Sequence, residues 1–259
     1  MTVTTASEIR GESPKSQSRR ESPGALRSLV TMEIQTRQAQ RLVYGRKASE
    51  DKHGIVGLLR FAALLRPIWS GAAADDPYAD WRLVLIEREM TAAREHLQQS
   101  REHVAQVLGN APAVDIKVAQ SIEPIKVELV FNNPCAYHGA YLLGEYDALV
   151  RTVLTARHVG LLDRGTAERV LREGGRAVRR VYSLAQGYRY LGVTRDDVRQ
   201  GTARAIRARE MMDPVPQEVL DGTLRASLAP EIRRSAESIV EEEDDDVALG
   251  KEAGMGAAV

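Results

Sequence analysis

The strongest constraint on the fold is a run of apolar side chains that recur every three or four residues between positions 83 and 108. Its members are Leu83, Ile86, Met90, Ala93, Leu97, Val104 and Leu108. Asp76-Pro77 stands before the run, and an Asp cap followed by proline at the first helical position is a strong helix start. Gly109-Asn110 follows and stops a helix. The sequence therefore predicts one long amphipathic helix, with Arg, Glu and Gln on its opposite face.

Apolar spacing predicts four further helices. The first is a buried helix over residues 54–69, which Pro67 closes. The second begins after Asn132-Asn133-Pro134 and runs to about Leu162, and the third follows a break at residues 163–166. The fourth begins at Thr194, where a threonine with an acid three residues later resembles a capping box, and it runs to about Met211.

Three shorter segments alternate apolar and polar side chains, which is the period of a half-buried strand. They cover residues 29–36, 114–118 and 125–131, and residues 121–124 can turn the chain between the last two. In the first strand Val30, Met32 and Ile34 should face the core. The predicted fold class is α+β and mainly α: a helical body with a small, mostly antiparallel sheet. A ribbon-helix-helix-like arrangement is one interpretation of the C-terminal half.

Composition divides the chain into one folded domain and two tails. Residues 1–28 are rich in Ser, Thr, Arg, Glu and Pro and hold few large apolar side chains, which predicts a disordered N-terminal tail. Residues 29–228 form the predicted single domain, with strand, helices and hairpin followed by arginine-rich helices. From 229 to 259 apolar residues are again sparse, and the acidic run at 241–246 predicts a second disordered tail.

The number of cysteines and the lengths of the apolar stretches indicate the cellular compartment. Cys135 is the single cysteine, so it has no partner for an internal disulfide, which suits a reducing cytoplasm. No apolar stretch approaches the length of a membrane span, and the N-terminal residues lack the apolar stretch of a signal peptide. We therefore expect a cytoplasmic protein with no membrane partner.

Positive charge is concentrated in residues 151–209. The whole chain is neutral, with 36 basic and 36 acidic residues, but this stretch holds fourteen arginines and five acids, a formal charge of +9. Five of its arginines follow one flank of the helix predicted after residue 166. They are Arg169, Arg172, Arg176, Arg179 and Arg180. Guanidinium groups in such a row can engage successive phosphates, which predicts salt-sensitive binding of nucleic acid.

The order of elements in the C-terminal half matches a ribbon-helix-helix DNA-binding unit, whose paired strands enter the major groove. On that interpretation exposed strand residues would face bases, and Thr166 with the first N–H groups of its helix would hold a phosphate. The predicted DNA-binding residues are Lys126, Glu128, Val130, Arg164, Thr166, Arg169, Arg172, Arg176, Arg179 and Arg180. The alternatives are a half-buried strand of an ordinary sheet and a solvated basic helix, since 30 of the 36 basic residues are arginine.

No group of residues has the spacing of an active site or a metal site. Cys135 and His138 could act as nucleophile and base, but a lone cysteine beside a turn is far more often a packing residue. His96 and His103 lie two turns apart on the long helix, wider than a metal pair favours. Gly54-Ile55-Val56-Gly57 lacks the lysine of a phosphate loop. We expect no enzyme, no metal and no cofactor.

Seven short motifs stand out as a set. They are Ala39-Gln40-Arg41-Leu42-Val43, Gly45-Arg46-Lys47, Leu64-Leu65-Arg66-Pro67-Ile68-Trp69, Asp75-Asp76-Pro77-Tyr78-Ala79-Asp80-Trp81, Leu154-Thr155-Ala156-Arg157-His158-Val159-Gly160-Leu161-Leu162-Asp163-Arg164, Gln186-Gly187-Tyr188-Arg189 and Leu191-Gly192-Val193-Thr194-Arg195. Together they resemble a family of proteins encoded on integrating conjugative elements. That family is similar to the AcaB-like transcriptional regulators of conjugative plasmids. The resemblance implies a ribbon-helix-helix DNA binder that activates transfer genes.

The leading hypothesis is a cytoplasmic DNA-binding transcriptional regulator that is encoded by an integrating conjugative element and acts on conjugation or transfer genes. A homodimer is expected, because ribbon-helix-helix strands pair across a two-fold axis. The acidic run at 241–246 would compete with DNA for the arginines.

The second hypothesis is a non-enzymatic interaction protein of the element's transfer or maintenance machinery. Trp69, Tyr78 and Trp81 cluster along residues 69–81 and could form an aromatic platform for a protein partner of the conjugation machinery. Core packing is the more frequent use of such side chains.

Overall fold

The computed structural model describes residues 30–50 and 53–233. Its elements are β1 (Val30–Ile34), α1 (Arg37–Tyr44), α2 (Leu58–Ala73), α3 (Pro77–Gly109), β2 (Ile125–Leu129), α4 (Pro134–His158), α5 (Arg164–Leu184), α6 (Arg195–Gln200), α7 (Ala203–Met211) and α8 (Gln217–Leu220). The predicted tail of residues 1–28, and residues 234–259 of the predicted acidic tail, lie outside the described residues.

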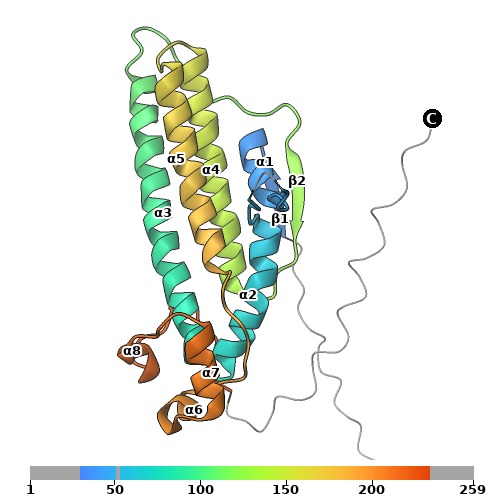
Figure 1. Ribbon diagram of the computed structural model, residues 1–259. Helices are drawn as coiled ribbons and strands as arrows, with labels where there is room; N and C mark the ends of the chain where they lie inside the picture. Colours follow the sequence, from blue (N-terminus) through green and yellow to red (C-terminus); the bar gives the residue numbers. More distant parts are fainter. Residues whose placement is uncertain (1–29, 51–52, 234–259) are drawn as a thin grey trace, which may run out of the picture.

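The body of the protein is built on α3, α4 and α5, which lie side by side along their lengths (Figure 1). α3 is the predicted long helix, and the Asp76 carboxylate caps it by accepting from the N–H groups of Tyr78 and Ala79. α4 begins in the same way, with Asn133 as its cap and Pro134 in its first turn. The apolar side chains of the three helices form most of the buried core.

The sheet has two strands, which come from distant parts of the sequence. β1 pairs antiparallel with β2, so that Val30 lies opposite Leu129 and Ile34 opposite Ile125. Val30, Met32 and Ile34 face the core as predicted. The predicted α+β, mainly helical class is confirmed in this form.

The predicted strand over residues 114–118 is wrong. Within residues 30–50 and 53–233 this segment pairs with no strand, and β2 pairs with β1 instead. Backbone groups just after it bond to α4: the Ala119 N–H donates to Thr155 Oγ1 at 3.0 Å, and Arg151 Nε donates to the Ala119 carbonyl at 3.0 Å. Ile116 and Val118 are half-buried against the core. The alternation of apolar and polar residues therefore reflects a segment with one side packed on the core, without strand pairing.

The predicted buried helix is α2, but Pro67 does not close it, because α2 continues to Ala73. Proline removes the N–H that would bond to the carbonyl of residue i−4, which here is Ala63. Both Pro67 and Ala63 lie on the exposed side of α2, where water can satisfy that carbonyl. The helix therefore passes through the proline.

The last predicted helix is two short helices, α6 and α7. The expected capping box is present at the start of α6, where Thr194 and Asp197 bond reciprocally. Gly201 ends α6 in the left-handed conformation, at φ 65°, and Thr202 begins α7 by accepting from the Ala205 N–H. A stop and a new start therefore interrupt the predicted run.

Four charged side chains, which we name the Asp80 cluster, join the C-terminal helices to the start of α3: Asp75, Asp80, Arg195 and Arg225. Arg195 is 4% exposed, and its guanidinium bonds to Asp75 and, at 2.6 Å, to Asp80. Arg225 makes two bonds of 2.9 Å to the carboxylate of Asp80. The two arginines also donate to the carbonyls of Val219, Ala72 and Pro230. This bonding holds α6, α8 and the chain up to residue 230 against the bundle.

Asp80→Asn should lower the free energy of unfolding by about 3–5 kcal/mol, because the carboxylate between two largely buried guanidinium groups is removed. Urea denaturation measures the loss. Asp221→Asn is the control, since Asp221 is exposed and only accepts a hydrogen bond from Gln217; a surface change of this kind stays within about 0.5 kcal/mol. Equal losses in the two variants would contradict the role of the Asp80 cluster.

Asp76 is buried beside this cluster and also accepts a hydrogen bond from the Tyr188 hydroxyl at 2.8 Å. Burial raises the pKa of Asp76 to about 6, although the hydrogen bonds from Tyr188 and from the Tyr78 N–H oppose the rise. Between about pH 4 and pH 6 the folded protein therefore holds a proton that the unfolded chain has released. The stability due to this group falls as the pH rises through that window.

Asp76→Asn keeps a capping oxygen but does not titrate. Because the native chain loses stability from Asp76 as the pH rises from about 4 to about 6, the variant should gain stability relative to the native chain over that range. Unfolding free energies measured at both ends of the range test this. A difference between the two chains that stays constant with pH would refute the buried titration.

Candidate nucleic-acid interface

α5 has one side made for close packing and one side made of arginine. Ala167, Val178 and Val181 are fully buried, and they face the body of the protein. A Cβ built on Gly174 would lie 3.0 Å from the nearest side-chain atom of Leu97, so glycine lets α5 approach α3 closely. At 3.6 residues per turn these positions lie opposite the arginines. Packing therefore fixes which side of α5 faces solvent.

The arginine row consists of Arg169, Arg172, Arg176 and Arg179. The first three are exposed and Arg179 is half-buried. None of the four forms an ion pair with a carboxylate among the described residues (30–50 and 53–233). The row extends about 15 Å along the helix, long enough to follow several phosphates of one DNA strand. It is the longest run of arginines on α5 that forms no ion pair among the described residues.

The arginines beside the row are neutralised. Arg180 Nη1 lies 3.0 Å from Glu89 Oε1 of α3, and Arg164 Nε lies 2.7 Å from Glu168 Oε1. The Glu168 pair is exposed, and the Arg164 guanidinium holds the pKa of Glu168 below its usual value through a hydrogen bond and through charge. Exposed pairs of this kind add little stability, but they reduce the charge available to a phosphate.

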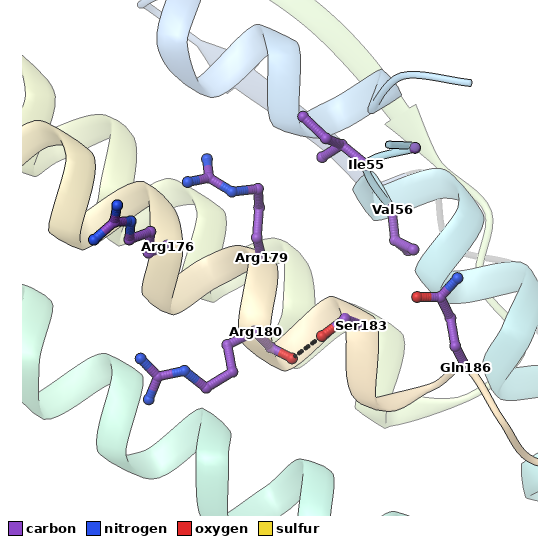
Figure 2. Close-up of a pocket in the computed structure, with 8 residues that line it drawn as sticks. Ile55, Val56, Arg176, Arg179, Arg180, Ser183 and Gln186 are labelled. Carbon is purple, nitrogen blue, oxygen red and sulfur yellow. Dashed lines mark hydrogen bonds between the residues drawn. The ribbon is translucent and has the colours of Figure 1, made fainter. Parts of the chain in front are cut away.

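A groove of about 450 Å³ runs beside the arginine row. Arg176, Arg179 and Arg180 line it from α5, and the segment 54–56 before α2 forms its other wall (Figure 2). Ser183 and Gln186 complete the lining. Figure 2 shows Arg180 directed toward α3 and Arg179 directed to the other side of α5. The groove thus combines apolar side chains of the 54–56 segment with cationic side chains of α5.

The first turn of α5 already holds a carboxylate. Asp163 caps the helix, and its Oδ1 accepts from the Thr166 N–H at 2.9 Å. Hydrogen bonds from Thr166 lower the pKa of Asp163, so this cap is ionised at neutral pH. The N–H group that was predicted to hold a phosphate is therefore bonded to the chain's own acid, and a phosphate there would meet a like charge.

The exposed face of the ribbon formed by β1 and β2 is not basic. Lys126 lies opposite Glu33, with Lys126 Nζ 3.8 Å from Glu33 Oε1, and Glu128 lies opposite Thr31. All four side chains are exposed, and Val130 just beyond β2 is 75% exposed. In Figure 1 α1 lies between the ribbon and α5. The predicted strand residues and the predicted helix residues therefore form two separate groups.

The wider arginine-rich region does not form one surface. Arg195 is buried in the Asp80 cluster, and Arg199 and Arg204 pair with Asp196 and Asp197. α6 and α7 lie beyond the end of α5, beside the start of α3 (Figure 1). The charge of +9 counted in the sequence is thus divided, and the arginine row of α5 is the part that combines exposure with spacing.

The candidate catalytic pair does not have the chemistry of an active site. Cys135 is 8% exposed, and burial raises the pKa of its thiol to about 12, so the thiolate needed for attack is scarce at neutral pH. The described residues contain no group of three or more His, Cys, Asp or Glu side chains arranged to hold a metal ion. None of the helices within residues 30–50 and 53–233 is both long and apolar enough to cross a membrane.

A family model described as Transcriptional regulator AcaB matches residues 22–233. The chain belongs to the AcaB family of transcriptional regulators. Its fold is also similar to the crystal structure of selenomethionine-containing AcaB from uropathogenic E. coli, with a TM-score of 0.53 and 13% sequence identity over 77% of this chain and 97% of that chain. At that identity the likeness shows the fold alone. No curated protein matches the chain.

Three of the seven motifs that resemble the AcaB family bond to one another in this chain. The aspartates of the motif at 75–81 bond to Tyr188 and Arg195, which belong to the motifs at 186–189 and 191–195. Trp69 and Trp81 are half-buried against the core and Tyr78 is buried, so residues 69–81 are not an exposed aromatic platform. These AcaB-family motifs therefore hold the C-terminal helices in place.

Proposed function

We propose that this AcaB-family protein regulates transcription by binding DNA through the arginine row of α5. The observation that carries the proposal is the row itself: four arginines on one side of a helix, without carboxylate partners among the described residues. Family membership supports a regulator of transcription, and a regulator that acts directly on promoters binds DNA. The segment 54–56 and Gln186 would contribute as the walls beside the row.

Charge favours α5 over the ribbon as the first contact with the phosphate backbone. A strand that enters the major groove passes between two rows of phosphates. The exposed side of the ribbon carries Glu33 and Glu128 beside Lys126. Two carboxylates against one ammonium would repel DNA, whereas the arginine row attracts it. We therefore assign Lys126, Glu128 and Val130 a secondary role in this proposal.

The order β2, α4, α5 is the order of elements in a ribbon-helix-helix unit, and it supports a homodimer as the finer proposal. β2 already has β1 as its partner, so a second copy is not needed to complete the ribbon. The outer edge of each strand has no strand partner in the described part of the chain, and a second copy could pair there. Light scattering coupled to size exclusion measures the mass directly.

The motif set supports a further proposal on origin and targets: a regulator encoded by an integrating conjugative element that acts on conjugation or transfer genes in the cytoplasm. Sequencing of the DNA that co-purifies with the tagged chain tests it. Enrichment of promoters of transfer genes is expected. Recovery of DNA without any preferred site would overturn the assignment of targets and leave general DNA binding in place.

The triple variant Arg172→Gln, Arg176→Gln and Arg179→Gln should weaken binding to a random-sequence DNA duplex by about tenfold or more at low salt. It should also reduce the slope of log affinity against log salt by about 2–3. The variant contacts fewer phosphates, so its binding releases fewer counterions. Fluorescence anisotropy across a salt series measures both quantities. The fold should persist, since these side chains have no ion-pair partner in the described residues to lose.

The matched control is the triple variant Arg66→Gln, Arg101→Gln and Arg207→Gln. These arginines are exposed on α2, α3 and α7, so the control loses the same charge away from α5. Its affinity and salt slope should stay close to those of the native chain. If both triple variants lose affinity equally, DNA responds to total charge, and the arginine row is not the site.

A further inference from the structure

The groove beside the arginine row is suited to an acidic segment that carries apolar side chains. Its wall before α2 presents Ile55 and Val56, both half-buried, and its α5 wall presents Arg176 and Arg179. Neither arginine has a carboxylate partner among the described residues. A ligand that fills the groove must therefore supply apolar contact at one wall and negative charge at the other.

The chain contains one segment with that pattern. Ile239 and Val240 are followed directly by six acids at positions 241–246. A bare polyanion would satisfy the arginines only, whereas this order of residues matches both walls. The match in chemistry therefore favours this segment over a simple phosphate as the occupant.

The path of the chain places the segment within reach. The Arg233 N–H donates to the Ala73 carbonyl at 2.8 Å, so the described chain ends beside the last turn of α2. The groove lies at the other end of α2, because Ile55 and Val56 precede Leu58. A helix of 16 residues is about 24 Å long. The seven residues from 233 to 240 span at most about 25 Å, so an extended chain brings Val240 to the near end of the groove, and the acids that follow reach further.

We propose that residues 239–246 dock in this groove, with Val240 against the near end of the 54–56 segment, Ile239 just before it, and the acids on Arg176 and Arg179. DNA and this segment then compete for the same guanidinium groups, so the segment lowers DNA affinity at low salt. The competition rests on the function proposed above, whereas the docking does not. Because the segment belongs to the same chain, it needs no second molecule to reach the groove.

Two variants of the full chain test the docking. A charge-neutral variant carries Glu→Gln at 241–243 and Asp→Asn at 244–246. An apolar variant carries Ile239→Ser and Val240→Ser and keeps all six charges. NMR signals of the 54–56 amides and of the Arg176 and Arg179 side chains, recorded without DNA, report occupancy of the groove. Both variants should shift these signals away from their native positions.

Affinity for a random-sequence duplex then tests the competition. At low salt the charge-neutral variant should bind about tenfold more tightly than the native chain and the apolar variant about threefold, and both gains should vanish at high salt. Groove signals that are identical in the native and charge-neutral chains would overturn the docking. If the groove signals of the apolar variant equal those of the native chain, only general charge attraction holds the segment, and the groove is not its docking site.

The two proposals fail in different ways. If the groove signals shift as expected but the arginine-row variant binds DNA normally, the segment docks and the function assigned to α5 is wrong. If the row variant loses DNA affinity while the groove signals never respond to the segment, the function stands and the docking is wrong.

Discussion

The close packing of α5 on α3 and α4 is the constraint on which the rest of the functional surface depends. Small residues such as Gly174 and Ala177 face the bundle, and a larger side chain at Gly174 would meet Leu97 and Leu149. Once that side is buried, the helical period turns Arg172 and Arg176 to solvent. The exposure of the arginines does not follow from their own chemistry. It follows from the side of α5 that is buried in the core, which leaves the arginines on the solvent side.

The Asp80 cluster has a complementary part, because it fixes the C-terminal helices at one end of the bundle. Buried charges of this kind require mutual pairing, and Arg195 is fully committed to Asp75, Asp80 and a backbone carbonyl. An arginine that looks in the sequence like part of a basic surface is thus a structural group. Dividing the arginines into structural and solvent-facing sets is what reduces the candidate interface to α5.

Local signals in the sequence were sufficient for α3 and for the side of α5 that carries the row, since caps and helical spacing act within one element. They missed α1, although Thr36 caps it and Leu42 and Val43 are buried on one side; the preceding strand pattern ran up to the cap and hid the start. The pairing of β1 with β2 and the approach of the 54–56 segment to α5 are tertiary contacts. The spacing of residues close together in the sequence predicts neither of these two contacts.

The central claim is that DNA contacts the arginine row of α5, and mapping the contact by NMR tests it most directly. Titration of the full chain with a random-sequence duplex should produce its largest signal changes in α5 between Arg169 and Arg179, with smaller changes in the 54–56 segment. Changes confined to the ribbon or to α6 and α7, with α5 unaffected, would contradict the account.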